Sequence, residues 1–219
     1  MTANRKPLVW LHERIKTPPM PHAARVEAGY LLGLVQEGVK LAMPQSRPMP
    51  EIASRCHELR VTDGRAEWRI IYRIDDRAVA VVHIFEKKTR STPQRTIETC
   101  KRRLAAYDAR LRRHTMKASR KRKIERNGWK IGTAQELLGL TDEETAYVEL
   151  KLTLSRKLRE RRKKHEVTQV QLAKRIGSSQ SRVAKMEAGD PSVSIDLLIR
   201  SLLALGVSPK TLARSMGSL

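Results

Sequence analysis

Cationic side chains gather on three neighbouring segments of the first half of the chain that have strand-like sequences. They include Arg60, Arg69 and Lys88. Side chains on paired antiparallel strands lie about 5 Å apart, so such cations repel one another unless an anion binds between them. Phosphate fits this role, because a guanidinium group is a planar fork for its oxygens and an ammonium group is a point charge. The alternative interpretation is a solvated ladder of surface charges.

The sequence around these side chains predicts strands and helices that together form a small α+β domain. Residues 68–74 alternate, with Trp68 and Tyr72 on one face and Arg69 and Arg73 on the other. We expect the charged face to point away from the apolar layer, and the Pro-rich segment 43–50 to break regular structure. The predicted strands are 6–12, 56–61, 67–75 and 78–85, with an Asp63-Gly64 turn, and the predicted helices are 21–39 and a segment that begins after Thr92-Pro93.

The second half predicts a helix bundle. Capping boxes begin at Thr133, Thr141 and Thr168, and each marks the start of a helix. The Gly177-Ser178-Ser179 turn separates two short helices, and Gly189 ends the second of them. A helix, a short turn that contains Gly and a second helix form the helix-turn-helix arrangement.

Composition restricts the class of partner. The chain has 219 residues, a formal net charge of +22 and a pI near 10.7. This charge favours a nucleic acid or another polyanion as the partner. Two cysteines exclude a disulfide framework and a four-cysteine zinc module. We expect a cytoplasmic protein without a metal, a cofactor, a membrane span or a secretory signal.

The motifs CHELR (56–60), WRIIYRID (68–75) and FEKKT (85–89), followed by TPQRTIETCKRRL, resemble the RelE/HigB-type toxins of bacterial toxin–antitoxin modules. The likeness is to their phage-derived branch and covers most of residues 5–112. It implies an mRNA interferase, an endoribonuclease that cuts messages on the ribosome without a metal. In that reaction the ribose 2′-hydroxyl attacks the adjacent phosphate, which requires a proton acceptor, cations on the developing charge and a proton donor for the leaving oxygen.

The resemblance also implies roles for the cations. Arg69 matches the strand arginine that holds the scissile phosphate. Lys88 matches a basic residue that stabilises the transition state, and Arg60 and Lys87 fit accessory phosphate or rRNA contacts.

The identity of the general base stays open between Glu58 and His57, which should face opposite ways on their strand. Arg73 shares the side of Arg69 and completes the predicted catalytic set. Tyr107 matches a C-terminal tyrosine of some relatives, but it lies with Cys100 on the apolar stripe of its helix. Both residues are expected in the core.

The string T-Q-x-x-L-A-x-x-x-G-S-S-x-S-x-V-x-x-x-E-x-G (168–189) resembles the lambda-repressor/Cro-like superfamily, or XRE family. In that fold the second helix lies in the major groove, where Gln suits adenine and Arg suits guanine. We expect Glu187 to pair with an arginine of an earlier helix, such as Arg159. The alternative is a helical scaffold with incidental charges. The predicted DNA contacts are Gln169, Gln180, Ser181, Arg182 and Lys185.

Together the two resemblances indicate a toxin fused to a HigA-like antitoxin. The predicted domains are a toxin domain (1–114), a basic linker (115–132) and a helix-turn-helix domain (133–219, with its core at 153–216). The expected partners are mRNA on the ribosome, operator DNA and a second copy of the chain, bound through the helix-turn-helix domain. The alternative is a transcriptional regulator whose first domain is an inert interaction module.

One acidic segment interrupts the basic second half. Residues 133–150 contain five acids and no Lys or Arg. We expect these side chains to dock on the basic face of the toxin domain and inhibit it, although blocking of access to the ribosome is a second possible route. They are Glu136, Asp142, Glu143, Glu144 and Glu149.

Overall fold

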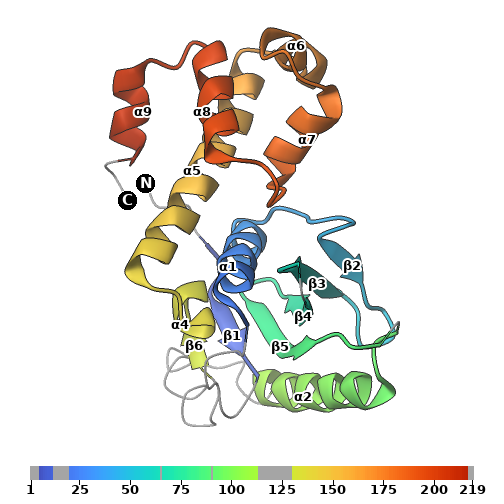
Figure 1. Cartoon of the computed structure of the whole chain (residues 1–219). Coiled ribbons are helices and arrows are strands. Elements are labelled where there is room, and N and C mark those ends of the chain that lie inside the picture. The colour runs from blue at the N-terminus through green and yellow to red at the C-terminus, as the bar shows by residue number, and fades with distance from the viewer. Residues whose placement is uncertain (1–4, 12–19, 65, 90, 113–129, 217–219) are drawn as a thin grey trace.

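The computed structural model describes residues 5–11, 20–64, 66–89, 91–112 and 130–216 (Figure 1). Its first half is built on a six-stranded mixed sheet with the order β2-β3-β4-β5-β1-β6. All neighbours pair antiparallel except β1 and β5. The strands are β1 (Leu8–Trp10), β2 (Ser46–Pro48), β3 (Cys56–Thr62), β4 (Glu67–Ile74), β5 (Val79–Glu86) and β6 (Lys130–Gly132).

The middle of the sheet follows the alternating sequence closely. Gly64 has φ +83°, which suits the predicted turn between β3 and β4. A bulge in the β4–β5 ladder shifts the register between Ile71 and Tyr72. The Pro-rich segment is not wholly irregular, because Ser46–Pro48 forms the edge strand β2. An edge strand tolerates Pro48, since one of its sides needs no ladder hydrogen bond.

Two helices cover opposite faces of this sheet. Helix α1 (His22–Gln36) lies over the face that carries Trp68 and Tyr72, and helix α2 (Gln94–Arg112) lies over the face that carries Ile71. Cys100 and Tyr107 are buried on the side of α2 that packs against the sheet, as their apolar stripe predicted. Arg69 and Arg73 share the α2 face, so the charged face is covered rather than open, which corrects the expectation.

The second half completes the core of the first. Strand β6 falls inside the predicted basic linker, yet it pairs with β1 at the sheet edge. Helices α4 (Ala134–Leu138) and α5 (Asp142–Lys164) then pack on α1. A Cβ at Gly33 would lie only 2.6 Å from Leu152 Cδ1, so a side chain is absent where α5 approaches closely. The first core therefore continues to Leu152, beyond the predicted boundary at 133.

The remaining helices form a second unit around a core of their own, to which Leu154 and Leu158 of α5 contribute (Figure 1). All three predicted capping boxes are present. Because α5 is continuous from one core to the other, the same helix belongs to both units. The further helices are α6 (Gln169–Arg175), α7 (Gln180–Ala188), α8 (Ile195–Ala204) and α9 (Pro209–Met216). In the part of the chain that the structure describes, no helix is long and apolar enough to cross a membrane.

Candidate nucleic-acid interfaces

A buried carboxylate organises the cations of the first half. Glu58 has no exposed surface, and the Nε atoms of Arg47, Arg60 and Arg69 lie 3.9, 3.2 and 3.5 Å from its Oε1. The hydroxyl of Thr92 donates a hydrogen bond to Oε2 at 3.0 Å. We call these five residues the Glu58 cluster. Three guanidinium groups share one internal anion, so positive charge remains available to an external one.

The five members come from separate elements that the register brings together. Arg60 pairs directly with Arg69 across β3 and β4. Thr92 lies just before α2, and Arg47 lies on β2. Sequence reasoning missed Arg47 and Thr92, because Arg47 falls in the Pro-rich segment and Thr92 was taken only as a helix cap.

Arg69 is the least accessible cation of the cluster. Its side chain is 5% exposed, and it donates to the carbonyl oxygen of Trp68 and to Glu67. Its Nε atom is buried and lacks a well-formed hydrogen bond. One donor of the predicted phosphate-binding arginine therefore remains unsatisfied beside Glu58.

The two predicted lysines follow β5 at the same end of the sheet. The backbone amide of Lys87 bonds to the carbonyl oxygen of Glu67, which places it beside β4. The side chain of Lys88 is 76% exposed and lies 3.4 Å from Glu86. Both lysines are therefore near the β4 end that carries Arg69.

The structure separates two predicted site residues from this cluster. His57 stacks on Tyr72, with 5.5 Å between the ring centroids, on the face covered by α1. Burial lowers the pKa of His57. Arg73 is buried at the other end of its strand, where it donates to Asp108 and Asp75. Hydrogen bonding to Asp108 is the main cause that raises the pKa of Arg73. His57 is thus not positioned as a base beside Glu58, and Arg73 is held by its own carboxylates.

The helix-turn-helix unit presents its predicted contacts on one surface. Gln180 at the start of α7 donates to Gln169 at the start of α6, at 2.7 Å. Ser181, Arg182 and Lys185 are exposed on α7. Val183 and Met186, on the other side of the helix, are fully buried. The buried and exposed sides of α7 are therefore the ones that the sequence predicted.

Glu187 holds the two helices of this motif against α5. Both of its carboxylate oxygens accept from Arg162, and Oε2 also accepts from Gln169. Pairing with the Glu187 carboxylate raises the pKa of Arg162. The expectation of an arginine from an earlier helix is confirmed, but the partner is Arg162 rather than Arg159. Glu187 therefore holds the side chain of Gln169 in place for its predicted DNA contact.

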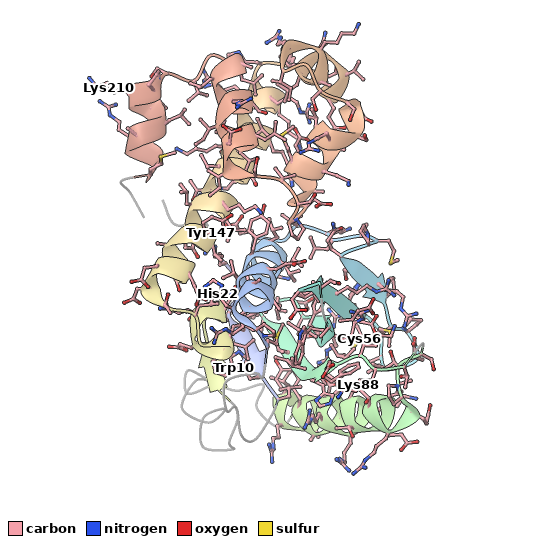
Figure 2. The ribbon with its side chains drawn as sticks, in the orientation of Figure 1. Trp10, His22, Cys56, Lys88, Tyr147 and Lys210 are labelled. Atoms are coloured by element: carbon pink, nitrogen blue, oxygen red, sulfur yellow. The ribbon has the colours of Figure 1, made fainter. Side chains whose placement is uncertain are left out.

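The acidic segment contacts the first half at a different place from the one expected. Glu149 pairs with Arg5 at 2.5 Å, and Glu144 pairs with His22 at 2.8 Å. Figure 2 shows that His22 lies between α1 and α5, whereas Lys88 lies beside α2. These carboxylates contact Arg5, His22 and Arg25 around α1 and do not reach Arg69 or Lys88 in the structure.

The other acids of this segment serve local structure or face solvent. Glu136 and Glu144 close the capping boxes of α4 and α5. Asp142 accepts from Gln135, and Glu143 is fully exposed. Among the described residues, no group of three or more His, Cys, Asp or Glu side chains could hold a metal ion.

Comparison with known proteins finds one family match in each half of the chain. Residues 18–105 match the family model of phage-derived Gp49-like proteins, and residues 158–212 match a helix-turn-helix family model. No protein with a curated description matches the chain, and neither does a solved structure. The resemblance of each half is confirmed in the expected order. In one chain, this protein joins a phage-derived Gp49-like domain of a toxin family to a helix-turn-helix domain of the XRE family.

Proposed function

We propose that the chain is a fused toxin–antitoxin module, in which a ribosome-dependent mRNA endonuclease domain is silenced by a helix-turn-helix domain that binds operator DNA. The observation that carries this proposal is the shared core. Strand β6, helix α4 and the first part of α5 complete the fold of the toxin-like half. In this proposal the nuclease domain and the DNA-binding domain therefore stay together, because they share a core within one chain.

The Glu58 cluster supports the RNA-directed half of the proposal. Arg60 and Lys88 can contact a phosphate from solvent, whereas the buried guanidinium group of Arg69 lies beside Glu58 and adds positive potential from within. In a transphosphorylation these cations stabilise the negative charge that develops on the attacked phosphate. Arg60 and Arg69 are direct partners across β3 and β4, and Lys88 follows β5 at the same end of the sheet.

Glu58 acts in this proposal as a counter-ion rather than as the general base. A carboxylate without exposed surface, held by Arg60 and Thr92, is out of reach of a ribose 2′-hydroxyl. Its role is to hold three arginines together before RNA binds. Removal of the proton then falls to a group supplied by the ribosome or to a base other than Glu58.

Silencing is steric in this proposal. The carboxylates of the acidic segment that form ion pairs do so around α1, with Arg5, His22 and Arg25, and not with the Glu58 cluster, so direct neutralisation of the cationic face is disfavoured. The helix-turn-helix unit instead adds bulk that α5 holds rigidly against the toxin-like half. A domain of that size beside the sheet would prevent access to the narrow mRNA site of the ribosome.

A shortened chain tests this proposal. Residues 1–156 retain the whole first core, including Leu152, and lose α6 to α9. We expect this chain to arrest growth and to cleave mRNA on translating ribosomes, whereas the full chain does neither. Arg69→Ala combined with Lys88→Ala should abolish both effects. Residues 1–115 are a poorer test, because they lack the apolar partners of α1.

Far-UV circular dichroism and tryptophan fluorescence serve as the folding control for residues 1–156. A folded shortened chain that neither arrests growth nor cuts mRNA refutes the nuclease. Arrest by the full chain refutes silencing in cis.

The second candidate function is a transcriptional regulator with an inert first domain. The burial of Glu58 and the position of His57 favour it, because neither predicted base reaches an RNA bound at the cluster. Inert residues 1–156, together with specific operator binding by the full chain, would establish this function instead.

A further inference from the structure

Exposed residues follow one side of the recognition helix α7 as far as its C-terminal end, which contacts the toxin-like half. Arg182, Lys185 and Ala188 are exposed at helical spacing along α7. The helix ends at Gly189, which has φ +70°, and a Cβ there would lie 2.1 Å from Leu34 Cδ1 of α1. The C-terminal end of α7 therefore rests on the first half with no space between them.

A hydrogen bond continues this contact into the next loop. Asp190 follows the cap of α7, and its Oδ2 accepts from Gln45 Nε2 at 2.7 Å. Gln45 directly precedes β2, and Arg47 lies two residues further on. In Figure 1 the loop from α1 to β2 passes directly beneath the end of α7, and β2 lies on the same side of the molecule as the α6–α7 turn.

This loop has the charge of a nucleic-acid contact. Residues 38–50 include Lys40 and Arg47 and contain no Asp or Glu. Lys40 is exposed, and the side chain of Arg47 is 40% exposed.

We propose that the toxin-like half forms part of the operator interface. A DNA duplex that places its major groove on Arg182 and Lys185 continues past the end of α7 and contacts Lys40 and Arg47 through its phosphates. The inference rests on the proposed operator binding and extends it to a surface outside the helix-turn-helix unit. The Leu34–Gly189 contact and the continuous helix α5 already place the loop before β2 beside the end of α7, so the two units need not move. The guanidinium group of Arg47 has to turn from Glu58 and Met49 toward the DNA.

Salt-dependent DNA binding by the full chain tests this proposal. The probe is a duplex of about 40 base pairs that the full chain selects from a randomised pool, and its affinity is measured by fluorescence anisotropy between 50 and 200 mM KCl. The plot of log K against log salt has a negative slope, and each lost phosphate contact makes that slope shallower by about 0.9. Lys40→Gln with Arg47→Gln should make it shallower by about 2 per protomer, and Lys40→Gln alone by about 1.

The matched control removes the same charge far from α7. Lys101 and Arg102 are exposed on α2, at the opposite end of the toxin-like half (Figure 1). Lys101→Gln with Arg102→Gln should leave the slope unchanged. Removal of the base pairs that flank the α7 site on the β2 side should weaken binding of the unmodified chain. The same removal should have no effect on the Lys40→Gln, Arg47→Gln chain.

The outcomes separate this inference from the function on which it rests. If Arg182→Gln leaves selection and affinity unchanged, operator binding through α7 fails. If Arg182→Gln abolishes specific binding while the Lys40→Gln, Arg47→Gln chain has the slope of the unmodified chain, these residues of the toxin-like half make no DNA contact. Equal slope changes in the α2 control would attribute the effect to net charge and would also overturn the proposal.

Discussion

Replacement of Leu152 by alanine should destabilise the toxin-like half, although Leu152 belongs to the helix that leads into the DNA-binding unit. Its side chain is 1% exposed and lies among residues of the first core. Its Cδ1 atom fills the space that Gly33 leaves on α1. The substitution removes buried methyl groups from a place where two helices are in close contact.

The size of the effect follows from this burial. Leucine-to-alanine substitutions at fully buried sites reduce the free energy of unfolding by about 2.7–5 kcal/mol, and the cost is largest where neighbours cannot collapse into the cavity. Here α1 and α5 are held on either side by the sheet and by the second core, so little collapse is possible. We expect a loss of about 3 kcal/mol. With a urea dependence of about 2 kcal/mol per molar, the unfolding midpoint falls by about 1.5 M.

Tryptophan fluorescence during urea unfolding measures this shift inside the first core. Trp10 and Trp68 are buried there, and a Trp129→Phe background removes the third tryptophan, which lies outside the described residues. Leu203→Ala is the matched control, because Leu203 is 44% exposed on α8. It should change the free energy of unfolding by less than about 0.5 kcal/mol.

Two results would refute the reasoning. One is an unchanged midpoint for Trp10 and Trp68 in the Leu152→Ala chain, since the toxin-like core would then be independent of α5. The other is a separate early transition in circular dichroism with a normal fluorescence midpoint, which would mean that α5 detaches without disturbing the sheet.

Two further predictions concern the buried Glu58 and the half-buried Glu27. Glu58→Gln removes the shared anion of three arginines, so the free energy of unfolding measured in urea titrations should fall by about 3 kcal/mol. The same change at the exposed Glu86 should have little effect. Equal stability of both variants would contradict the role of Glu58 as a counter-ion. Burial between α1 and α5 raises the pKa of Glu27 from 4.5 to about 7, despite the opposing charge of Lys151. The folded chain therefore binds a proton that the unfolded chain has released, and the free energy of unfolding should fall as pH rises from about 4.5 to 7. Glu27→Gln should remove this part of the pH dependence, whereas Glu98→Gln on exposed α2 should retain it.

The local elements could be predicted from the sequence because their signals are local. The alternation of β4, the Asp63-Gly64 turn and the capping boxes depend on residues a few positions apart. The orientation of α7 follows in the same way from the spacing of Val183 and Met186. Both families were recognisable for this reason, since their motifs are continuous stretches of chain.

The partners of charged groups could not be predicted, because long-range packing selects them. The sequence indicated that Glu58, Arg60 and Arg69 share one face, but only the addition of β2 brought Arg47 to the same carboxylate. Glu187 pairs with Arg162 rather than Arg159. The two arginines lie three residues apart on α5, and their spacing alone does not show which of them faces α7. The acidic segment reached Arg5 and His22 for the same reason, since its apolar neighbours had already fixed it on α1.

The sequence by itself determined that one chain carries a toxin-family domain and a helix-turn-helix domain, because each is encoded by its own local pattern. Only the tertiary structure decided where the first domain ends. Leu140 and Leu152 follow the apparent linker in sequence, yet they fill the space beside Gly29 and Gly33 on α1. Hydrophobic burial depends on which surfaces pack together, and the residue spacing within α1 or within α5 does not show that these two helices pack on each other.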